Sequence, residues 1–93
     1  MTYELEFSEK ALREWKKLGA NLRDQFKKKL LERLVNPHVP ADRLHGLGNA
    51  YKIKLRSAGY RMVYRVFDEV LVVTVIAVGK RERTDVYRNA GAR

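Results

Sequence analysis

Four cations in one short stretch, Lys52, Lys54, Arg56 and Arg61, are the residues of this chain with the clearest capacity for chemistry. They stand in YKIKLRSAGYRMVY, residues 51–64, where every charged position is Lys or Arg. Neighbouring like charges repel one another, so a cationic set without an acid indicates an anion that binds from outside. Phosphate groups fit that description, and a nucleic-acid backbone presents them in a row.

The same stretch alternates apolar and cationic residues, which is typical of strands with one buried face. Burial of the apolar positions turns the cations to the opposite face, and neighbouring antiparallel strands then place their cations on the same side of the sheet. The predicted patch contains Lys52, Lys54 and Arg61, with Arg56 and Arg65 beside them. The competing interpretation is a solvated face that maintains solubility and discourages edge pairing.

A second cationic segment, VGKRERTDVY, follows the last apolar run of the chain. It contains Lys80, Arg81 and Arg83, and Tyr87 comes six residues after Arg81. Cations that bind phosphates beside an aromatic ring that stacks on a base are a recurring arrangement for single-stranded nucleic acid. A tyrosine that only docks its own segment is the alternative.

Cleavage of RNA by its own 2′-OH requires a base for that hydroxyl, stabilisation of charge at phosphorus and a proton for the leaving oxygen. The sequence offers no clear His/Glu pair, since His38 and His45 both lie in an irregular loop. A lysine can act as the base when neighbouring cations lower its pKa, and Lys52 and Lys54 have such neighbours. Arginine keeps its proton and suits phosphate binding, which is the role expected of Arg61 and Arg81.

The elements that must position these residues follow from hydrophobic periodicity. Residues 2–7 alternate as a short strand, and Ser8 is a typical cap for a first helix. We expect Gly19 to end that helix in a left-handed conformation and Asn21 to cap a second helix, which stops before Pro37. The second helix has an expected apolar stripe of Leu22, Phe26, Leu30, Leu31 and Leu34.

Three more strands are predicted near residues 50–56, 60–67 and 70–78. The connections between them are short enough to require antiparallel neighbours, and the last strand is apolar on both faces, which favours the middle of the sheet. The sequence therefore predicts an α+β fold in the order β-α-α-β-β-β. In that fold an N-terminal helical hairpin packs on one face of a small antiparallel β-sheet, in a single domain over residues 1–93.

Composition narrows the classes of function. Twenty Lys and Arg residues against eleven Asp and Glu give a net charge of +9, which favours a polyanionic partner. The absence of cysteine excludes disulfides, thiolate metal sites and a cysteine nucleophile, and no His/carboxylate cluster has the spacing of a metal site. No cofactor is expected. Without a signal peptide or a run long enough to span a bilayer, we expect a cytoplasmic protein with no membrane partner.

Three segments together resemble a known family: ALREWKKLG, YKIKLRSAGYRMVYRV and VGKRERTDVY are closely similar to the RelE toxins of bacterial type II toxin-antitoxin systems. The similarity, to the RelE/ParE superfamily as a whole and to RelE in particular, extends from Tyr3 to Tyr87. It implies a metal-independent mRNA interferase that cuts messenger RNA in the A site of the 70S ribosome and thereby inhibits translation. The implied reaction uses the 2′-OH as nucleophile and leaves a 2′,3′-cyclic phosphate and a 5′-OH.

The resemblance also implies functional side chains, which correspond here to Lys52, Lys54, Arg61, Arg81 and Tyr87. By this analogy the lysines activate the 2′-OH and steady the phosphate, the arginines hold the phosphate and the leaving oxygen, and the tyrosine stacks on a codon base. Contacts to RNA or the ribosome are expected from the remaining cations, namely Arg56, Arg65, Lys80 and Arg83.

The implied partner is a RelB-like antitoxin, whose own N-terminal part binds operator DNA, so contact of the toxin with DNA is only indirect. The implied setting is the cytoplasm of a bacterium or archaeon. Two alternatives stay open: a ParE-like inhibitor of DNA gyrase, which has no evident need for the cationic cluster, and a non-catalytic RNA- or ribosome-binding module, which would use the same cations.

Overall fold

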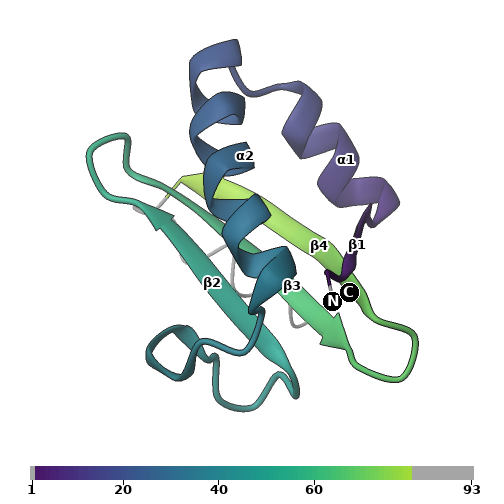
Figure 1. The fold of residues 1–93 in the computed structure, drawn as a ribbon. Helices are drawn as coiled ribbons and strands as arrows, with labels where there is room; N and C mark the ends of the chain where they lie inside the picture. Colours follow the sequence, from purple (N-terminus) through teal and green to yellow (C-terminus); the bar gives the residue numbers. More distant parts are fainter. Residues whose placement is uncertain (1, 81–93) are drawn as a thin grey trace.

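The computed structural model describes residues 2–80 of the 93-residue chain. Two helices lie against one face of a four-stranded sheet (Figure 1). The elements in chain order are β1 (Glu4–Phe7), α1 (Glu9–Lys16), α2 (Ala20–Val35), the short 3-10 helix η1 (Pro40–Asp42), β2 (Ala50–Leu55), β3 (Tyr60–Phe67) and β4 (Val72–Lys80). The predicted α+β class and element order are confirmed, while the predicted residues Arg81, Arg83 and Tyr87 lie outside the described part.

The strands are arranged in the order β1-β4-β3-β2, so β4 occupies the interior of the sheet as predicted. The pairs β2/β3 and β3/β4 are antiparallel, as their short connections require. β1 instead pairs parallel with β4, with Glu4 opposite Val72, and the sheet is therefore mixed rather than wholly antiparallel. Alternation in residues 2–7 predicts a strand but contains no information about the direction of its distant partner.

A small residue is the N-cap of each of the two helices. The backbone N–H of Ala11 donates to Ser8 Oγ at 3.2 Å, so Ser8 caps α1 as predicted. The expectations for Gly19 and Asn21 are wrong. Gly19 is extended rather than left-handed, and it takes the place of Asn21 as the N-cap of α2. The connection between the helices is therefore shorter than the sequence pattern indicated.

The main core lies between the helices and the sheet. Trp15 contacts Phe7 and Phe26 with ring centroids 5.2 Å and 6.3 Å apart. The rest of this core includes Ala11, Leu30, Ile53, Met62, Tyr64, Val73 and Val75. Leu31 does not join it: its side chain is 65% exposed, because it is about 100° around the helix from Leu30 and faces solvent.

The opposite face of the sheet carries a second, smaller apolar cluster. A β-bulge shifts the register between Val63 and Tyr64, so that Val63 pairs with Ala77 while Tyr64 pairs with Val75. Ile76 and Ala77 therefore both face away from the helices. They pack with Ala50 and Val63 beneath two loop residues, Leu44 and Leu47. This cluster explains why β4 is apolar on both faces.

A polar network fixes the loop after α2 to the sheet. His38 Nδ1 lies 2.9 Å from the Tyr51 hydroxyl, and His38 Nε2 lies 2.7 Å from Asp68 Oδ1. The Tyr3 hydroxyl donates to the same carboxylate oxygen at 2.7 Å. The network joins the start of the chain, this loop, β2 and the β3–β4 turn, so His38 has structural contacts.

This network predicts a pH dependence of stability. The hydrogen bond with His38, followed by that from Tyr3, holds the pKa of Asp68 below its ordinary value. A carboxyl with a lowered pKa in the folded state contributes stability above its unfolded pKa of about 4, and that contribution disappears as pH falls through the folded value. In urea unfolding, the advantage of the wild type over Asp68→Asn should therefore shrink below about pH 4. A difference that stays constant down to pH 2 would contradict this prediction.

Candidate nucleic-acid interface

The register of β2 and β3 brings the predicted cations together. Lys54 lies directly opposite Arg61, and the preceding pair, Ile53 and Met62, is buried in the core beneath the helices. Because side chains alternate along a strand, Lys52, Lys54 and Arg61 project from the helix-free face. Arg65 shares that face. The register brings these four of the five predicted cations together, and we call Lys52, Lys54, Arg61 and Arg65 the basic face.

Mutual repulsion alters the chemistry of Lys54. The positive charge of Lys52 lowers the pKa of Lys54 most strongly, followed by partial burial and a hydrogen bond with Lys52. The charges of Arg61 and Arg56 lower the same pKa further. A larger fraction of Lys54 is therefore neutral near pH 7 than of an isolated lysine, which is the property a general base requires.

The origin of this pKa shift can be tested by removing its largest cause. In Lys52→Gln the Lys54 ammonium loses its nearest like charge, so its pKa should rise back toward the ordinary lysine value of about 10.4. The measurement is an NMR titration of the Lys54 side-chain carbon next to nitrogen. Lys29→Gln on the exposed side of α2 is the control and should leave the midpoint unchanged. An unchanged midpoint in Lys52→Gln would contradict the assigned cause.

The remaining described cations differ in position. Arg56 is exposed immediately after β2, at the end of the basic face. Arg65 lies between Ala50 and Thr74 of the neighbouring strands, and its buried Nε has no hydrogen-bond partner among the described residues. Lys80 pairs with Tyr60, which packs on the helix-covered core, so its register does not bring Lys80 to the basic face.

Small and apolar residues separate the cations. Lys52 is opposite Val63, which is fully buried, and Arg61 is opposite Gly79 on the β4 side. Gly79 places no side chain beside the Lys54/Arg61 pair. Val63 lies beneath the loop residues Leu44 and Leu47, so Gly79 is the residue that leaves room for a sugar or base beside the charges.

Arg33 supports this face from behind and was not identified from the sequence. Its guanidinium donates to the Lys52 carbonyl oxygen at 3.2 Å, to the Tyr64 hydroxyl at 2.9 Å and to Asp42 Oδ2 at 2.6 Å. A signal was present, because Arg33 is three residues after Leu30 on the buried side of α2. An arginine on an apolar helix stripe indicates a buried partner.

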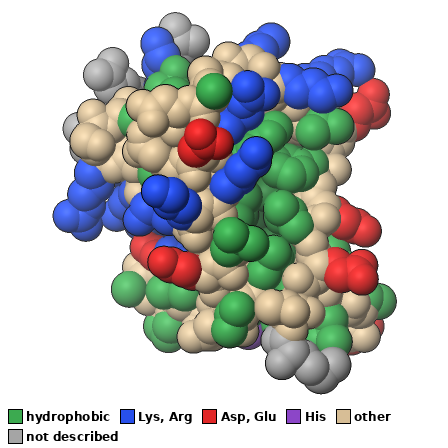
Figure 2. Space-filling model, turned by 45° about the horizontal axis from the view of Figure 1, so that its top comes forward, with side chains coloured by type: hydrophobic (Ala, Val, Ile, Leu, Met, Phe, Trp, Pro, Cys, Tyr) green, Lys and Arg blue, Asp and Glu red, His purple; other side chains and the backbone are tan. Residues whose placement is uncertain are grey.

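Charge alone does not single out this site. On the face drawn in Figure 2, Lys and Arg side chains lie above and to the left of a strip of apolar side chains, and Asp and Glu side chains lie to its right. Among residues 2–80, no three His, Asp or Glu side chains lie close enough to hold a metal ion. Within the same residues, no helix is long and apolar enough to cross a membrane. The strand register, rather than net charge, defines the basic face.

The chain matches a known protein family in both sequence and fold. Residues 5–85 match the family model described as ParE toxin of type II toxin-antitoxin system, parDE. The chain therefore belongs to this family of type II toxin-antitoxin toxins. Within it, the chain is 58% identical over 90 residues to the mRNA interferase toxin RelE of Escherichia coli K12, covering 97% of this chain and 95% of that protein. The resemblance to RelE noted from the sequence is confirmed.

Solved structures give the same result. A double Arg-to-Ala mutant of E. coli RelE in the free state has a TM-score of 0.93 and 55% identity, covering 100% of this chain and 98% of that one. The mutant in complex with a peptide of the antitoxin RelB has a TM-score of 0.84 and 56% identity, covering 97% and 95%. These structures confirm the two-helix, four-strand architecture.

Proposed function

We propose that this chain is the toxin of a type II toxin-antitoxin system and a ribosome-dependent mRNA interferase, acting as one domain over residues 1–93. The observation that carries the proposal is the basic face, where Lys54 lies opposite Arg61 and has a lowered pKa. Its relatives in E. coli and Shigella flexneri bear the name mRNA interferase at 58% identity over nearly their full lengths.

In the proposed reaction, neutral Lys54 accepts the proton of the 2′-OH, and the 2′-oxygen attacks the adjacent phosphorus. The charges of Lys52 and Arg61 stabilise the extra negative charge that develops on the phosphate oxygens. The bond from phosphorus to the 5′-oxygen breaks, that oxygen takes up a proton from water, and Lys54 later returns its extra proton to the solvent. The products are a 2′,3′-cyclic phosphate and a 5′-OH.

The resemblance to RelE adds two residues outside the described part of the chain. Arg81 would hold the phosphate and the leaving oxygen, and Tyr87 would stack on a base of the codon. Contacts with RNA or the ribosome are proposed for Arg56 and Arg65, which lie at opposite ends of the basic face. They are also proposed for Lys80, on the other face of the sheet, and for Arg83.

The proposed substrate is messenger RNA held in the A site of the 70S ribosome. A face built from Lys and Arg binds phosphates but contains no His/Glu pair to drive proton transfer on any RNA that it meets. Positioning of the substrate by the ribosome would supply the in-line geometry. Activity on free RNA should then be very low, and the protein would act in the cytoplasm, where ribosomes translate.

The proposed regulator is a RelB-like antitoxin. E. coli RelE has been solved both with intact RelB and with a RelB peptide, and this chain is 58% and 56% identical to the toxins in those complexes. A cognate antitoxin would hold the toxin inactive and would provide any contact with operator DNA itself.

A second candidate function is inhibition of DNA gyrase, because the matching family model takes its name from ParE. The basic face has no evident purpose in a gyrase inhibitor, so we rank this candidate second. A non-catalytic ribosome-binding module is the third.

One experiment separates the three. The protein is added to a translating extract, mRNA ends are mapped by primer extension, and naked mRNA is treated in parallel. Cuts in phase with codons, found only on ribosomes, are expected. Intact mRNA with inhibited DNA supercoiling would indicate gyrase inhibition, and ribosome binding without cuts would indicate the non-catalytic module.

A further inference from the structure

The basic face ends in an exposed aromatic ring. Along β3, alternate residues from Arg61 through Val63 and Arg65 lead to Phe67 on the same helix-free side. Phe67 is 44% exposed although it is a large apolar side chain. The strand therefore presents a guanidinium and an aromatic ring two residues apart on the face proposed to bind RNA.

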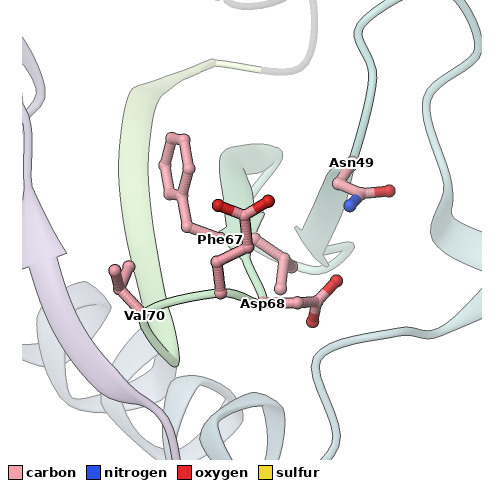
Figure 3. A pocket seen from close by; sticks show the side chains of 6 residues that line it. Asn49, Phe67, Asp68 and Val70 are labelled. Carbon is pink, nitrogen blue, oxygen red and sulfur yellow. The ribbon is translucent and has the colours of Figure 1, made fainter.

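Phe67 borders two hollows at this end of the sheet. One hollow, of about 420 Å³, is lined by Arg65, Phe67 and the loop residues 46–49. The other, of about 390 Å³, is lined by Asn49, Val66, Phe67 and the β3–β4 turn, residues 68–70. In Figure 3 the Phe67 ring extends from the end of β3, and Asn49 lies across the hollow from it.

Backbone contacts and two glycines shape the loop side of these hollows. The Val66 N–H donates to the Asn49 carbonyl oxygen at 2.8 Å, which fixes Asn49 beside β3. Gly46 and Gly48 both have positive φ, at 84° and 68°, and no heavy atom lies within 4 Å of where a Cβ would stand on either. The loop thus forms a low rim beside the ring.

We infer that Phe67, Asn49 and Arg65 form a subsite for one RNA nucleotide, separate from the residues proposed to cut. The base stacks on Phe67, the Asn49 amide hydrogen-bonds the base edge, and Arg65 binds the phosphate. Six residues of strand separate Arg61 from Phe67, or roughly 20 Å at about 3.3 Å per residue. The bound nucleotide is therefore a few positions away from the scissile phosphate. The inference rests on the proposed function.

The charges around Phe67 indicate the path of the bound RNA strand. Asp68 and Glu69 lie on the turn side of the ring, and Arg65 lies on the loop side. Phosphates avoid the acids and follow Arg65, whose buried Nε lacks a hydrogen-bond partner among the described residues. Asp68 already accepts hydrogen bonds within the network of Tyr3 and His38. A ring beside a cation on the basic face favours a nucleotide over an apolar protein segment.

The test measures binding of the toxin to ribosomes programmed with an mRNA that carries a 2′-O-methyl group at the cut position, which prevents cleavage. Phe67→Leu keeps an apolar side chain but removes the aromatic face, and should weaken binding about 10-fold. Phe67→Trp should bind at least as tightly as the wild type. Leu31→Ser, which alters an exposed apolar residue on the helix face, is the control and should not change binding.

A second part of the experiment distinguishes two possible sources of the nucleotide, the mRNA and the ribosomal RNA. If the base belongs to the mRNA, one abasic substitution should weaken wild-type binding as much as Phe67→Leu does, without further loss in the combination. If it belongs to ribosomal RNA, no abasic mRNA should have that effect, and chemical protection of one ribosomal base should disappear with Phe67→Leu.

Three results would overturn the subsite. Phe67→Leu could bind ribosomes as tightly as the wild type while the wild type still cuts mRNA, which leaves the proposed function standing. Phe67→Leu could weaken only the binding of the antitoxin, which would make the ring part of a protein interface. A wild-type protein that neither binds ribosomes nor cuts mRNA would overturn the proposed function as well.

Discussion

Replacement of Arg61 by alanine should lower the rate of mRNA cleavage on ribosomes by about 100- to 1,000-fold, the usual cost of removing one donor that stabilises transition-state charge. Arg61 lies opposite Lys54 on β3, and its guanidinium is the described group best suited to bind two phosphate oxygens at once. The fold should survive, because the substitution reduces repulsion on the basic face.

The measurement is single-turnover cleavage at saturating toxin, with thermal unfolding as the check on folding. Arg61→Lys should recover only part of the rate, since an ammonium lacks the two-pronged geometry of a guanidinium. Arg13→Ala on α1 is the matched control, because it removes the same charge from an exposed site on the other layer. Cleavage by Arg61→Ala within a few-fold of the wild-type rate would contradict the role proposed for the basic face.

The largest loss of stability is expected from Arg33→Met, at about 2 to 3 kcal/mol. The Arg33 and Asp42 side chains are only 14% and 25% exposed, and their guanidinium and carboxylate are 2.6 Å apart. Methionine fills much of the space but leaves Asp42 as a half-buried charge. It also removes the donor to the Lys52 carbonyl oxygen and to the Tyr64 hydroxyl.

Urea unfolding of Arg33→Met, Asp42→Asn and the double variant forms the appropriate cycle. The double variant should be no less stable than Arg33→Met, because the stranded carboxylate is gone. Losses that simply add would show that the two side chains do not act as a pair.

The basic face was predictable because a strand has a period of two. Once Ile53 and Met62 were assigned to the core, the alternation fixed the side of Lys54 and Arg61 without knowledge of the exact register. The same alternation also places Phe67 on this face, although the pattern of charges alone gives no sign of it.

Other features depend on contacts that no local pattern contains. The parallel pairing of β1 with β4 and the bulge at Val63 are decided by the tertiary packing of distant segments. Position in the sequence groups Lys80 with the other cations, but its pairing with Tyr60 turns it toward the other face of the sheet. The proposed roles of Arg81 and Tyr87 rest on resemblance, and both residues lie outside the described part.

The central claim is that the basic face directs the 2′-OH of the mRNA against its own phosphate. Its most direct test uses a ribosome programmed with an mRNA that contains a single 2′-deoxyribose at the mapped cut position. Cleavage at that position should disappear, while the all-ribose mRNA yields a 2′,3′-cyclic phosphate and a 5′-OH. Cleavage of the deoxy-substituted mRNA at an unchanged rate would contradict the account, because the nucleophile would then be water.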